Sequence, residues 1–171
     1  MSVKQVMDDG EIGWNLAKIA KAILAEYPDT KNMVVLGIIT RGDNLARRIA
    51  KDLGKGVKVG SLDARPHRDD LKSESTEDRS DIPFSITDKD VILVDDVMST
   101  GRTIRAALDA VMGQGRPRSI KTAVLIDRGH RELPITADFV GAKIPTSVSE
   151  EIRVKLKEID GGKDGAYIMT R

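Results

Sequence analysis

The residues best suited to chemistry lie between Val91 and Thr103, in the sequence VILVDDVMSTGRT. Asp95 and Asp96 follow four apolar residues, a pattern typical of a strand buried on both faces of a parallel sheet. Adjacent carboxylates at the end of such a strand can accept hydrogen bonds from vicinal hydroxyls, directly or around a hard cation such as Mg²⁺. We therefore expect these two carboxylates to bind a sugar.

The turn that follows the carboxylates can hold a phosphate. Ser99, Thr100, Gly101 and Thr103 provide hydroxyls and unhindered backbone N–H groups at the start of a predicted helix. A simpler interpretation is a capped helix after a buried strand, but a single Asp or Ser is enough for a cap. The whole segment favours a site for a phosphorylated sugar.

The same 13 residues resemble the signature for 5-phosphoribosyl 1-pyrophosphate (PRPP) in the type I phosphoribosyltransferases. The resemblance implies that Asp95 and Asp96 are catalytic residues that hold the ribose hydroxyls and the Mg²⁺ ion, directly or through PRPP. It also implies that the following loop wraps the 5′-phosphate. The implied binding residues there are Val97, Met98, Ser99, Thr100, Gly101, Arg102 and Thr103, with Met98 and Ser99 in place of the more usual Leu-Tyr pair.

A second candidate segment runs from Gly37 to Asn44, GIITRGDN, after another apolar run. Thr40, Arg41 and Gly42 are expected to form a tight turn into a helix that Asp43 or Asn44 could cap. Backbone amides and a guanidinium suit a pyrophosphate. Alone, the segment is better explained as a plain strand-to-helix turn. Beside the signature it resembles the pyrophosphate loop of the same family, which often contains a cis peptide.

Residues 68–83, RDDLKSESTEDRSDIP, are almost wholly polar and show no regular period, which predicts a long mobile loop. Cleavage of the bond between ribose and pyrophosphate passes through an oxocarbenium-like state that water would intercept, so a closing lid has a purpose. Arg68, at the start of the loop, is the candidate catalytic residue. A charge-rich loop that is merely solvated is the alternative.

Composition limits the remaining possibilities. The 171 residues suit one domain, residues 1–171, and the absence of cysteine excludes disulfides and thiolate chemistry. Net charge is +1, but residues 63–96 are rich in Asp and Glu whereas residues 102–131 are rich in Lys and Arg, so we expect separate acidic and basic faces. No apolar run approaches the ~20 residues that span a bilayer, and no signal peptide is recognisable, which predicts a soluble, cytoplasmic protein with no membrane partner.

Hydrophobic periodicity predicts alternating helices and strands. Helical spacing covers Ile12 to Tyr27 and Asp43 to Leu53, and apolar runs mark Met33 to Ile39 and Ser119 to Ile126 as strands. Further predicted elements are a strand at 57–62, a helix at 103–112 and a hairpin over 154–169. The alternation predicts an α/β fold with a mostly parallel sheet flanked by helices. The type I phosphoribosyltransferase resemblance adds a small hood.

Longer segments resemble one branch of these enzymes, the PyrR family. They are SLDARPHRDDL and AVLIDRGHRELPITADFVGAKIPTS, and the likeness extends from about Ile12 to Ile168. It implies a uracil phosphoribosyltransferase, which makes UMP and pyrophosphate, and a homodimer or tetramer. It also implies regulation of pyrimidine operons by transcriptional attenuation, through binding of leader mRNA in response to UMP or UTP. Arg128 and the backbone after Pro145, around Ile152, are implied to lie near the base.

Candidate RNA-binding residues are Lys21, Arg116, Arg118, His130, Arg131 and Lys143, and with Arg105 and Arg128 several of them form a basic cluster in the sequence. A solvated face or a subunit interface would explain that cluster equally well. Only five aromatic residues are present, so stacking on aromatic side chains is not expected to dominate RNA recognition. His130 could be a general base, but an RNA-binding or structural role is favoured.

Ala17, Lys21 and Thr136 depart from the residues that regulatory PyrR proteins usually carry, which leaves three alternatives open. The chain could be a salvage enzyme without RNA regulation, a UMP-sensing regulator with incidental catalysis, or a purine phosphoribosyltransferase. The segment DRGHRELPI disfavours the purine alternative.

Overall fold

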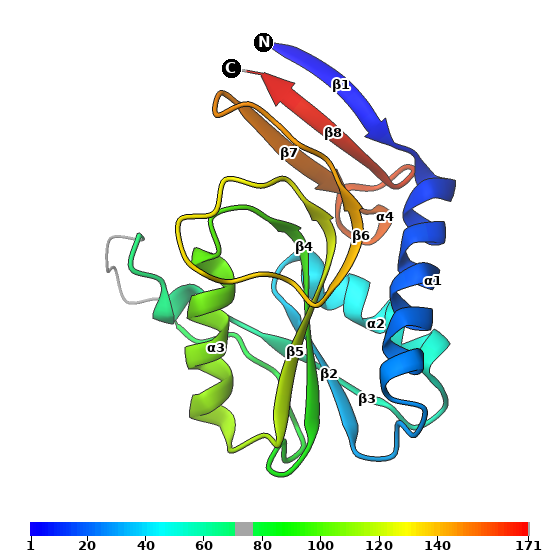
Figure 1. Cartoon of the computed structure of the whole chain (residues 1–171), viewed down its shortest axis with the longest axis vertical. Helices are drawn as coiled ribbons and strands as arrows, with labels where there is room; N and C mark the ends of the chain where they lie inside the picture. The colour runs from blue at the N-terminus through cyan, green and yellow to red at the C-terminus, as the bar shows by residue number, and fades with distance from the viewer. Residues whose placement is uncertain (71–76, 171) are drawn as a thin grey trace.

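The computed structural model describes residues 1–70 and 77–170. A five-stranded parallel sheet with strand order β3-β2-β4-β5-β6 forms its centre. The strands are β2 (Met33–Ile38), β3 (Lys58–Leu62), β4 (Asp90–Met98), β5 (Ser119–Asp127) and β6 (Phe139–Lys143). Helices α1 (Asp9–Glu26) and α2 (Arg41–Leu53) lie on one side of the sheet, and α3 (Arg102–Gln114) lies on the other (Figure 1). The predicted α/β fold is therefore confirmed.

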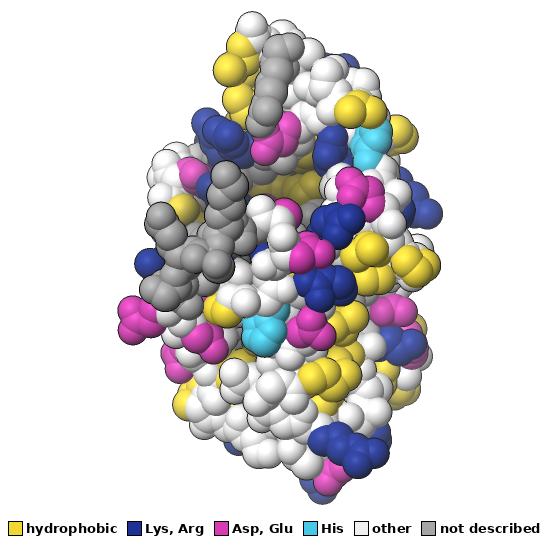
Figure 2. Space-filling model, turned by 90° about the vertical axis from the view of Figure 1, so that its left-hand side faces the viewer, with side chains coloured by type: hydrophobic (Ala, Val, Ile, Leu, Met, Phe, Trp, Pro, Cys, Tyr) yellow, Lys and Arg dark blue, Asp and Glu magenta, His cyan; other side chains and the backbone are white. Residues whose placement is uncertain are grey.

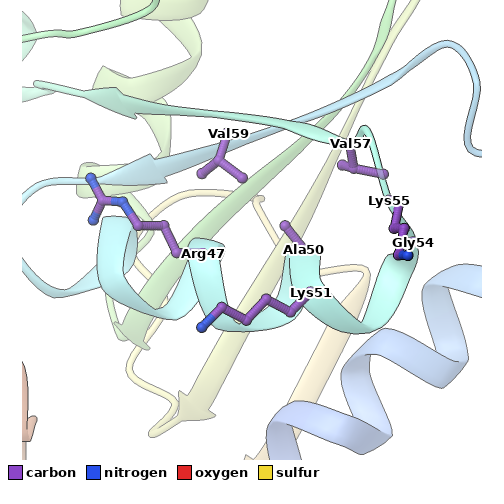
Figure 3. A pocket seen from close by; sticks show the side chains of 7 residues that line it. All are labelled: Arg47, Ala50, Lys51, Gly54, Lys55, Val57 and Val59. Atoms are coloured by element: carbon purple, nitrogen blue, oxygen red, sulfur yellow. The ribbon is translucent and has the colours of Figure 1, made fainter.

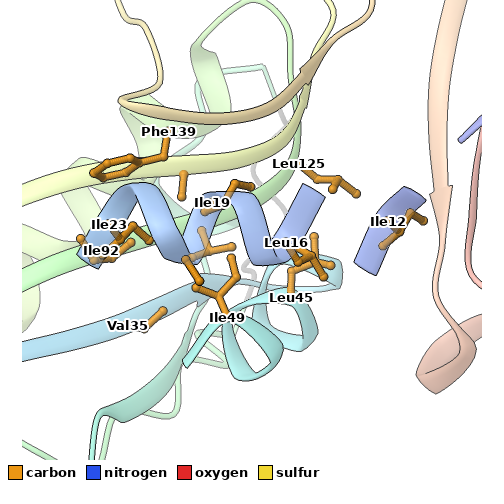
Figure 4. Packing of buried hydrophobic residues seen from close by; sticks show 14 of the residues in the cluster. Ile12, Leu16, Ile19, Ile23, Val35, Leu45, Ile49, Ile92, Leu125 and Phe139 are labelled. Atoms are coloured by element: carbon orange, nitrogen blue, oxygen red, sulfur yellow. The ribbon is translucent and has the colours of Figure 1, made fainter. Parts of the chain in front are cut away.

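Alternate residues of β4 point into two separate cores because side chains of a strand alternate between faces. Ile92 and Val94 pack under α1 and α2, whereas Val91 and Leu93 pack under α3. Figure 4 shows the first core, where the buried stripe of α1 meets α2 and the sheet. The labelled side chains are Ile12, Leu16, Ile19, Ile23, Val35, Leu45, Ile49, Ile92, Leu125 and Phe139. Burial on both faces explains the continuous apolar run of this strand.

A second, antiparallel sheet of order β1-β8-β7 stands above the parallel sheet (Figure 1). Its strands are β1 (Ser2–Met7), β7 (Glu150–Lys155) and β8 (Gly165–Thr170), and the short helix α4 (Lys157–Asp160) joins the last two. We call these four elements the hood. Arg48 of α2 clamps the hood through ion pairs to Glu158 at 2.6 Å and to Asp164 at 2.5 Å. The predicted C-terminal hairpin is confirmed.

Most other boundaries agree with the sequence analysis, with three differences. Helix α2 begins at Arg41, so Asp43 lies inside its first turn, and the prediction that Asp43 or Asn44 caps it was wrong. Strand β4 continues to Met98, so Asp95 and Asp96 lie within it. Strands β1 and β6 were not predicted. Of the predicted lid, residues 71–76 lie outside the described residues, and the short helix η1 (Arg65–His67) precedes it.

Candidate functional site

Four loops meet at one edge of the parallel sheet because the carboxyl ends of parallel strands lie together. They follow β2, β3, β4 and β5, and most of the predicted site residues lie in these loops or in the strand and helix ends that the loops join. Figure 2 shows that side chains of both charge signs surround a hollow on the face of the molecule where α3 lies. The site is therefore surrounded by charged groups of both signs.

The two carboxylates differ in environment although they are neighbours. Asp95 is buried, with 7% of its surface exposed, whereas Asp96 is half-buried. Burial, and then the negative charge of Asp96, raise the pKa of Asp95 well above the usual range of an aspartate. Such a pair is ready to accept hydroxyl hydrogen bonds or a cation, because either would offset the repulsion between the two groups.

Asp95 and Asp96 could hold Mg²⁺, since paired carboxylate oxygens are ligands that this ion accepts. Within residues 1–70 and 77–170, no cluster of three or more His, Cys, Asp or Glu side chains comes together as a metal site. The protein therefore offers Mg²⁺ a few carboxylate oxygens and not a complete cage. This donor set fits an ion that completes its shell with phosphate oxygens and water.

The loop from Ser99 to Gly101 has the geometry of an anion cradle. Gly101 has φ of +92°, a left-handed conformation that favours glycine, and it immediately precedes α3. Thr100 Oγ1 accepts a hydrogen bond from the backbone N–H of Arg102 at 3.2 Å. The backbone N–H groups of the first turn of α3 thus face the same end of the sheet as the carboxylates. We call residues 99–101 the phosphate loop.

The remaining signature residues divide into two kinds. The side chains of Val97 and Met98 pack against the hydrophobic cores, Val97 half-buried and Met98 buried, so any contact of Met98 with a ligand would come from its backbone, and the binding role of both residues stays a prediction. The guanidinium of Arg102 forms ion pairs with Glu132 and Asp69 at 2.9 and 3.2 Å. The sequence alone could not show which side chains of the signature point into the core and which point toward solvent, because the signature includes both strand and loop residues.

The turn after β2 contains a cis peptide bond between Ile39 and Thr40, as the family resemblance implied. Gly42 is buried against β4, and a Cβ atom there would lie 2.5 Å from the carbonyl oxygen of Val94. Arg41 extends toward the hood, where its Nη2 atom donates to Asp160 Oδ1 at 3.0 Å. The turn is therefore fixed on one side by the sheet and on the other by the hood.

Arg128 connects the phosphate loop to the segment before β7. Its Nη1 atom donates to Ser99 Oγ at 2.9 Å, its Nε atom donates to Thr146 Oγ1 at 3.0 Å, and its Nη2 atom donates to the carbonyl of Glu150. A pocket of about 480 Å³ lies beside it, lined by Arg128, Val148, Ser149, Glu150 and Glu151. The predicted proximity of Arg128 to the segment after Pro145 is thus present, although the Ile152 side chain packs into the core.

Two RNA-binding candidates, His130 and Arg131, take part in bonds within the protein. His130 Nε2 lies 2.7 Å from the carbonyl oxygen of Thr146. Arg131 donates to the carbonyl oxygen of Ser99 at 2.7 Å and forms an ion pair with Asp127 at 2.5 Å. The guanidinium of Arg131 therefore holds the phosphate loop in place, and its RNA-binding role stays a prediction.

The other candidates do not gather into one basic cluster. Arg116 and Arg118 precede β5 while His130 and Arg131 follow it, and a strand of this length separates its ends by about 27 Å. Arg118 also pairs with Asp90. Lys21 on α1 and Lys143 at the end of β6 are exposed. The predicted cluster was contiguous in sequence but is divided in space, because strand β5 runs through it.

Asp63, a residue that the sequence analysis missed, joins the short helix before the predicted lid to the later described part of the lid. Asp63 is buried, forms an ion pair with Arg65 at 2.6 Å, and accepts the backbone N–H of Arg79 at 3.1 Å. The hydrogen bond from Arg65 lowers the pKa of Asp63 to about 2. An aspartate at the end of a strand, followed by proline three residues later, was the available signal.

Arg68, at the beginning of the lid, contacts α3, the helix that contains the last residues of the signature. Its Nη1 atom donates to Thr103 Oγ1 at 2.6 Å, while the same guanidinium pairs with Asp70. The predicted catalytic residue of the lid and the predicted end of the signature are therefore in contact.

A different pocket, of about 460 Å³, lies between α2 and β3 (Figure 3). Its lining comes from the later part of α2, from Gly54 and Lys55, and from Val57 and Val59 at the start of β3. These residues lie toward the end of the sheet opposite to the phosphate loop, so this pocket is separate from the candidate site.

Comparison with known proteins identifies the class. A family model described as the phosphoribosyl transferase domain matches residues 2–159, so the fold and the site are those of a phosphoribosyltransferase. The hypoxanthine phosphoribosyltransferase of Trypanosoma cruzi has a similar fold, with a TM-score of 0.74 and 20% identity over 98% of this chain and 96% of that chain.

Sequence relatives identify the branch. The chain is 50% identical over 165 residues to the bifunctional protein PyrR of Streptococcus uberis, covering 94% of each chain. It is 51% identical over 164 residues to the bifunctional protein PyrR of Pelotomaculum thermopropionicum, covering 92% of this chain and 91% of that one. The chain therefore belongs to the PyrR family, as the sequence segments had indicated.

Proposed function

We propose that this protein transfers the phosphoribosyl group of PRPP to uracil, giving UMP and pyrophosphate, and that it regulates pyrimidine operons by binding leader mRNA in response to UMP or UTP. The observation that carries the proposal is the acid pair of β4 followed directly by the phosphate loop, in a chain half identical to bifunctional PyrR proteins. Residues 1–171 act as a single phosphoribosyltransferase domain.

PRPP is bound at both of its ends. Asp95 and Asp96 accept hydrogen bonds from the ribose hydroxyls, and the phosphate loop with the first turn of α3 binds the 5′-phosphate. Thr40, Arg41 and Gly42 provide backbone and guanidinium donors for the pyrophosphate. Mg²⁺, held by the carboxylates directly or through PRPP, supplies positive charge that offsets the charge of the pyrophosphate.

Uracil occupies the pocket beside Arg128, where the backbone of residues 148–151 offers amides and carbonyls to its O2, N3–H and O4 atoms. N1 of uracil attacks C1 of the ribose while the C1–O bond breaks, the electron pair of that bond leaves with pyrophosphate, and the departing pyrophosphate takes up the N1 proton. Arg68 donates a hydrogen bond to Thr103 of α3 and helps the lid to exclude water from the oxocarbenium-like state.

Regulation uses the nucleotide in this same site and a separate basic surface. Of the predicted RNA contacts, Lys21, Arg116, Arg118, His130 and Lys143 are exposed and Arg131 is half-buried. The protein assembles as a homodimer or tetramer and acts in the cytoplasm. No helix in the described part of the chain is both long and apolar enough to cross a bilayer.

A purine substrate is less well supported. The hypoxanthine phosphoribosyltransferases with a similar fold share only about a fifth of their residues with this chain, against half for the PyrR proteins. Their likeness therefore concerns the fold alone.

A paired experiment tests the proposal. Purified protein is assayed with PRPP, Mg²⁺ and either uracil or hypoxanthine, and the same sample is titrated with its own pyrimidine-operon leader RNA, with and without UMP, over a salt series. UMP synthesis together with tight, UMP-enhanced binding at moderate salt is expected. UMP synthesis with only weak, strongly salt-dependent binding would identify a salvage enzyme, and IMP synthesis would contradict the uracil assignment.

A further inference from the structure

We propose that Trp14 stacks on an unpaired base of the bound RNA, on a surface formed by α1 and the edge strand β6. The inference rests on the proposed regulatory function and adds to it a contact outside the catalytic site. Trp14 is the single tryptophan of the chain, and 67% of its surface is exposed. A large aromatic ring exposed to this degree on a helix contributes little to a core and is available to a partner.

The ring belongs to a stripe of exposed residues on α1. Trp14, Lys18 and Lys21 follow one another at four- and three-residue spacing, so they lie on one face of the helix. Ala17 lies beside them and is small, which leaves the neighbourhood of the ring open. The opposite face of α1 is buried in the core shown in Figure 4. The stripe therefore offers an aromatic platform followed by positive charge.

Strand β6 completes the surface. It is the last strand of the parallel sheet, and α1 packs against it where Gly141 has no side chain to keep Asn15 away. Lys18 Nζ donates to the carbonyl oxygen of Gly141 at 2.7 Å and lies 5.8 Å from the centre of the Trp14 ring. Helix and strand are therefore joined beside the indole, with the Lys18 ammonium close to the ring.

A pocket of about 510 Å³ adjoins the ring, between α1 and residues Val140–Lys143 of β6. Pockets of roughly this size accommodate small organic ligands. Apolar and polar groups both line it, and Lys18 and Lys143 place positive charge at its rim. The carboxylate of Glu11, also at the rim, accepts the backbone N–H of Asp8 at 2.8 Å as part of the helix cap.

This combination suits a single-stranded nucleotide better than a duplex. A flat aromatic side chain binds the face of an unstacked base, whereas neighbouring lysines bind its phosphates. An edge strand has outward backbone groups that can hydrogen-bond to the edge of the base. Two predicted RNA contacts thus lie on the same surface as Trp14 but on different elements, Lys21 on α1 and Lys143 on β6. Neither lysine alone would indicate that surface.

Fluorescence of Trp14 tests the contact directly because no other tryptophan contributes. The protein is titrated with its own leader RNA stem-loop and with a duplex made from the same stem. Trp14→Leu removes the ring, Trp14→Phe keeps an aromatic face, and Met112→Ala is the control because Met112 is 60% exposed on α3. UMP synthesis is measured for every variant and is expected to stay unchanged.

We expect the stem-loop to quench Trp14 fluorescence and the duplex to leave it nearly unchanged. Trp14→Leu is expected to weaken stem-loop affinity about tenfold, since stacking on one base is worth about 1–3 kcal/mol. Trp14→Phe is expected to weaken it by less than about threefold, and Met112→Ala to have no effect. Equal affinity of Trp14→Leu and wild type, or an equal loss for the duplex, would overturn the inference.

Two further outcomes separate this inference from the proposed function. RNA binding by the wild type without any change in Trp14 fluorescence overturns the stacking contact and leaves regulation in place. UMP synthesis without RNA binding at low salt overturns both the stacking contact and regulation. Sedimentation of Trp14→Leu as a smaller assembly than wild type would show that a second copy of the chain covers this surface, which also contradicts the inference.

Discussion

Arg128 donates a hydrogen bond to Ser99 at 2.9 Å, and this bond joins the loop after β5 to the phosphate loop after β4. Because the same guanidinium also reaches Thr146 and Glu150, one side chain connects the proposed phosphate and base positions. The two binding regions are therefore expected to respond together to changes at this residue.

Replacement of Arg128 by lysine is expected to lower kcat/KM about tenfold and to raise KM for both PRPP and uracil. A lysine keeps the charge but cannot donate in three directions from a planar group, so the two regions lose their connection. Steady-state kinetics with each substrate varied in turn measures the effect. Arg116→Lys, in the exposed segment before β5, is the matched control, and a rise in only one KM would contradict the connecting role.

Asp95→Asn and Asp96→Asn are expected to weaken PRPP binding at least tenfold while the fold stays intact. Asp95→Asn is also expected to raise the midpoint of urea unfolding slightly, because a buried carboxylate beside another acid is unfavourable. Calorimetric titration with PRPP and Mg²⁺ measures the affinity. Unchanged affinity in both variants would refute the assignment of the ribose-binding carboxylates.

The control for this pair is Asp90→Asn, at the other end of the same strand. Asp90 pairs with Arg118 and accepts a hydrogen bond from Ser119 at 2.7 Å. Loss of this paired charge is expected to lower the free energy of unfolding by about 1–3 kcal/mol and to leave PRPP affinity unchanged.

Gly42→Ala is expected to lower the free energy of unfolding by about 1–3 kcal/mol and to abolish PRPP binding. Its Cβ would lie 2.5 Å from the carbonyl oxygen of Val94, a backbone atom that can move only with the sheet. Gly13→Ala is the contrasting variant because no heavy atom lies within 4 Å of the added Cβ. In the interior of α1 it is expected to stabilise by about 1 kcal/mol, as measured by urea unfolding.

Asp63→Asn is expected to lower the free energy of unfolding by about 2 kcal/mol at pH 7. The folded-state pKa of about 2 is below the usual value of an aspartate, so the ionised group stabilises the protein at neutral pH. That contribution decreases below about pH 4 and is lost as the pH falls through the folded-state pKa.

Urea unfolding of wild type and Asp63→Asn from pH 7 downward measures this dependence. The difference between them should be constant above about pH 5 and become smaller as the pH falls further. Asp52→Asn, exposed on α2, should behave as wild type at every pH. A difference independent of pH would contradict the assignment.

Sequence periodicity was sufficient for β2, β3, β4 and β5 of the parallel sheet, because each of them buries a regular apolar pattern. Strand β6, with the sequence FVGAK, was missed because it is short and has a glycine at its centre. Strand β1 was missed because its side chains are mostly exposed, and it is held by pairing with β8. Pairing between the two ends of a chain leaves no local pattern.

The parts of the site that could be predicted are those whose residues are adjacent in sequence. Asp95, the phosphate loop and the turn at Thr40 were identified because each is a compact motif after a strand. The bonds from Arg128 and Arg131 to Ser99 were not, because they join segments about 30 residues apart. A count of basic residues could not show that Arg131 faces inward.

The pairing of β1 with β8 also limits when the hood can form during synthesis of the protein. Ser2 lies opposite Thr170 in this ladder, so the first and last strands of the chain are neighbours. Because β8 follows every strand of the parallel sheet along the chain, it is synthesised after all of them. The hood can therefore close only after the whole parallel sheet has been made, and the bond from Arg41 to Asp160 joins an early segment of the chain to one made after that sheet.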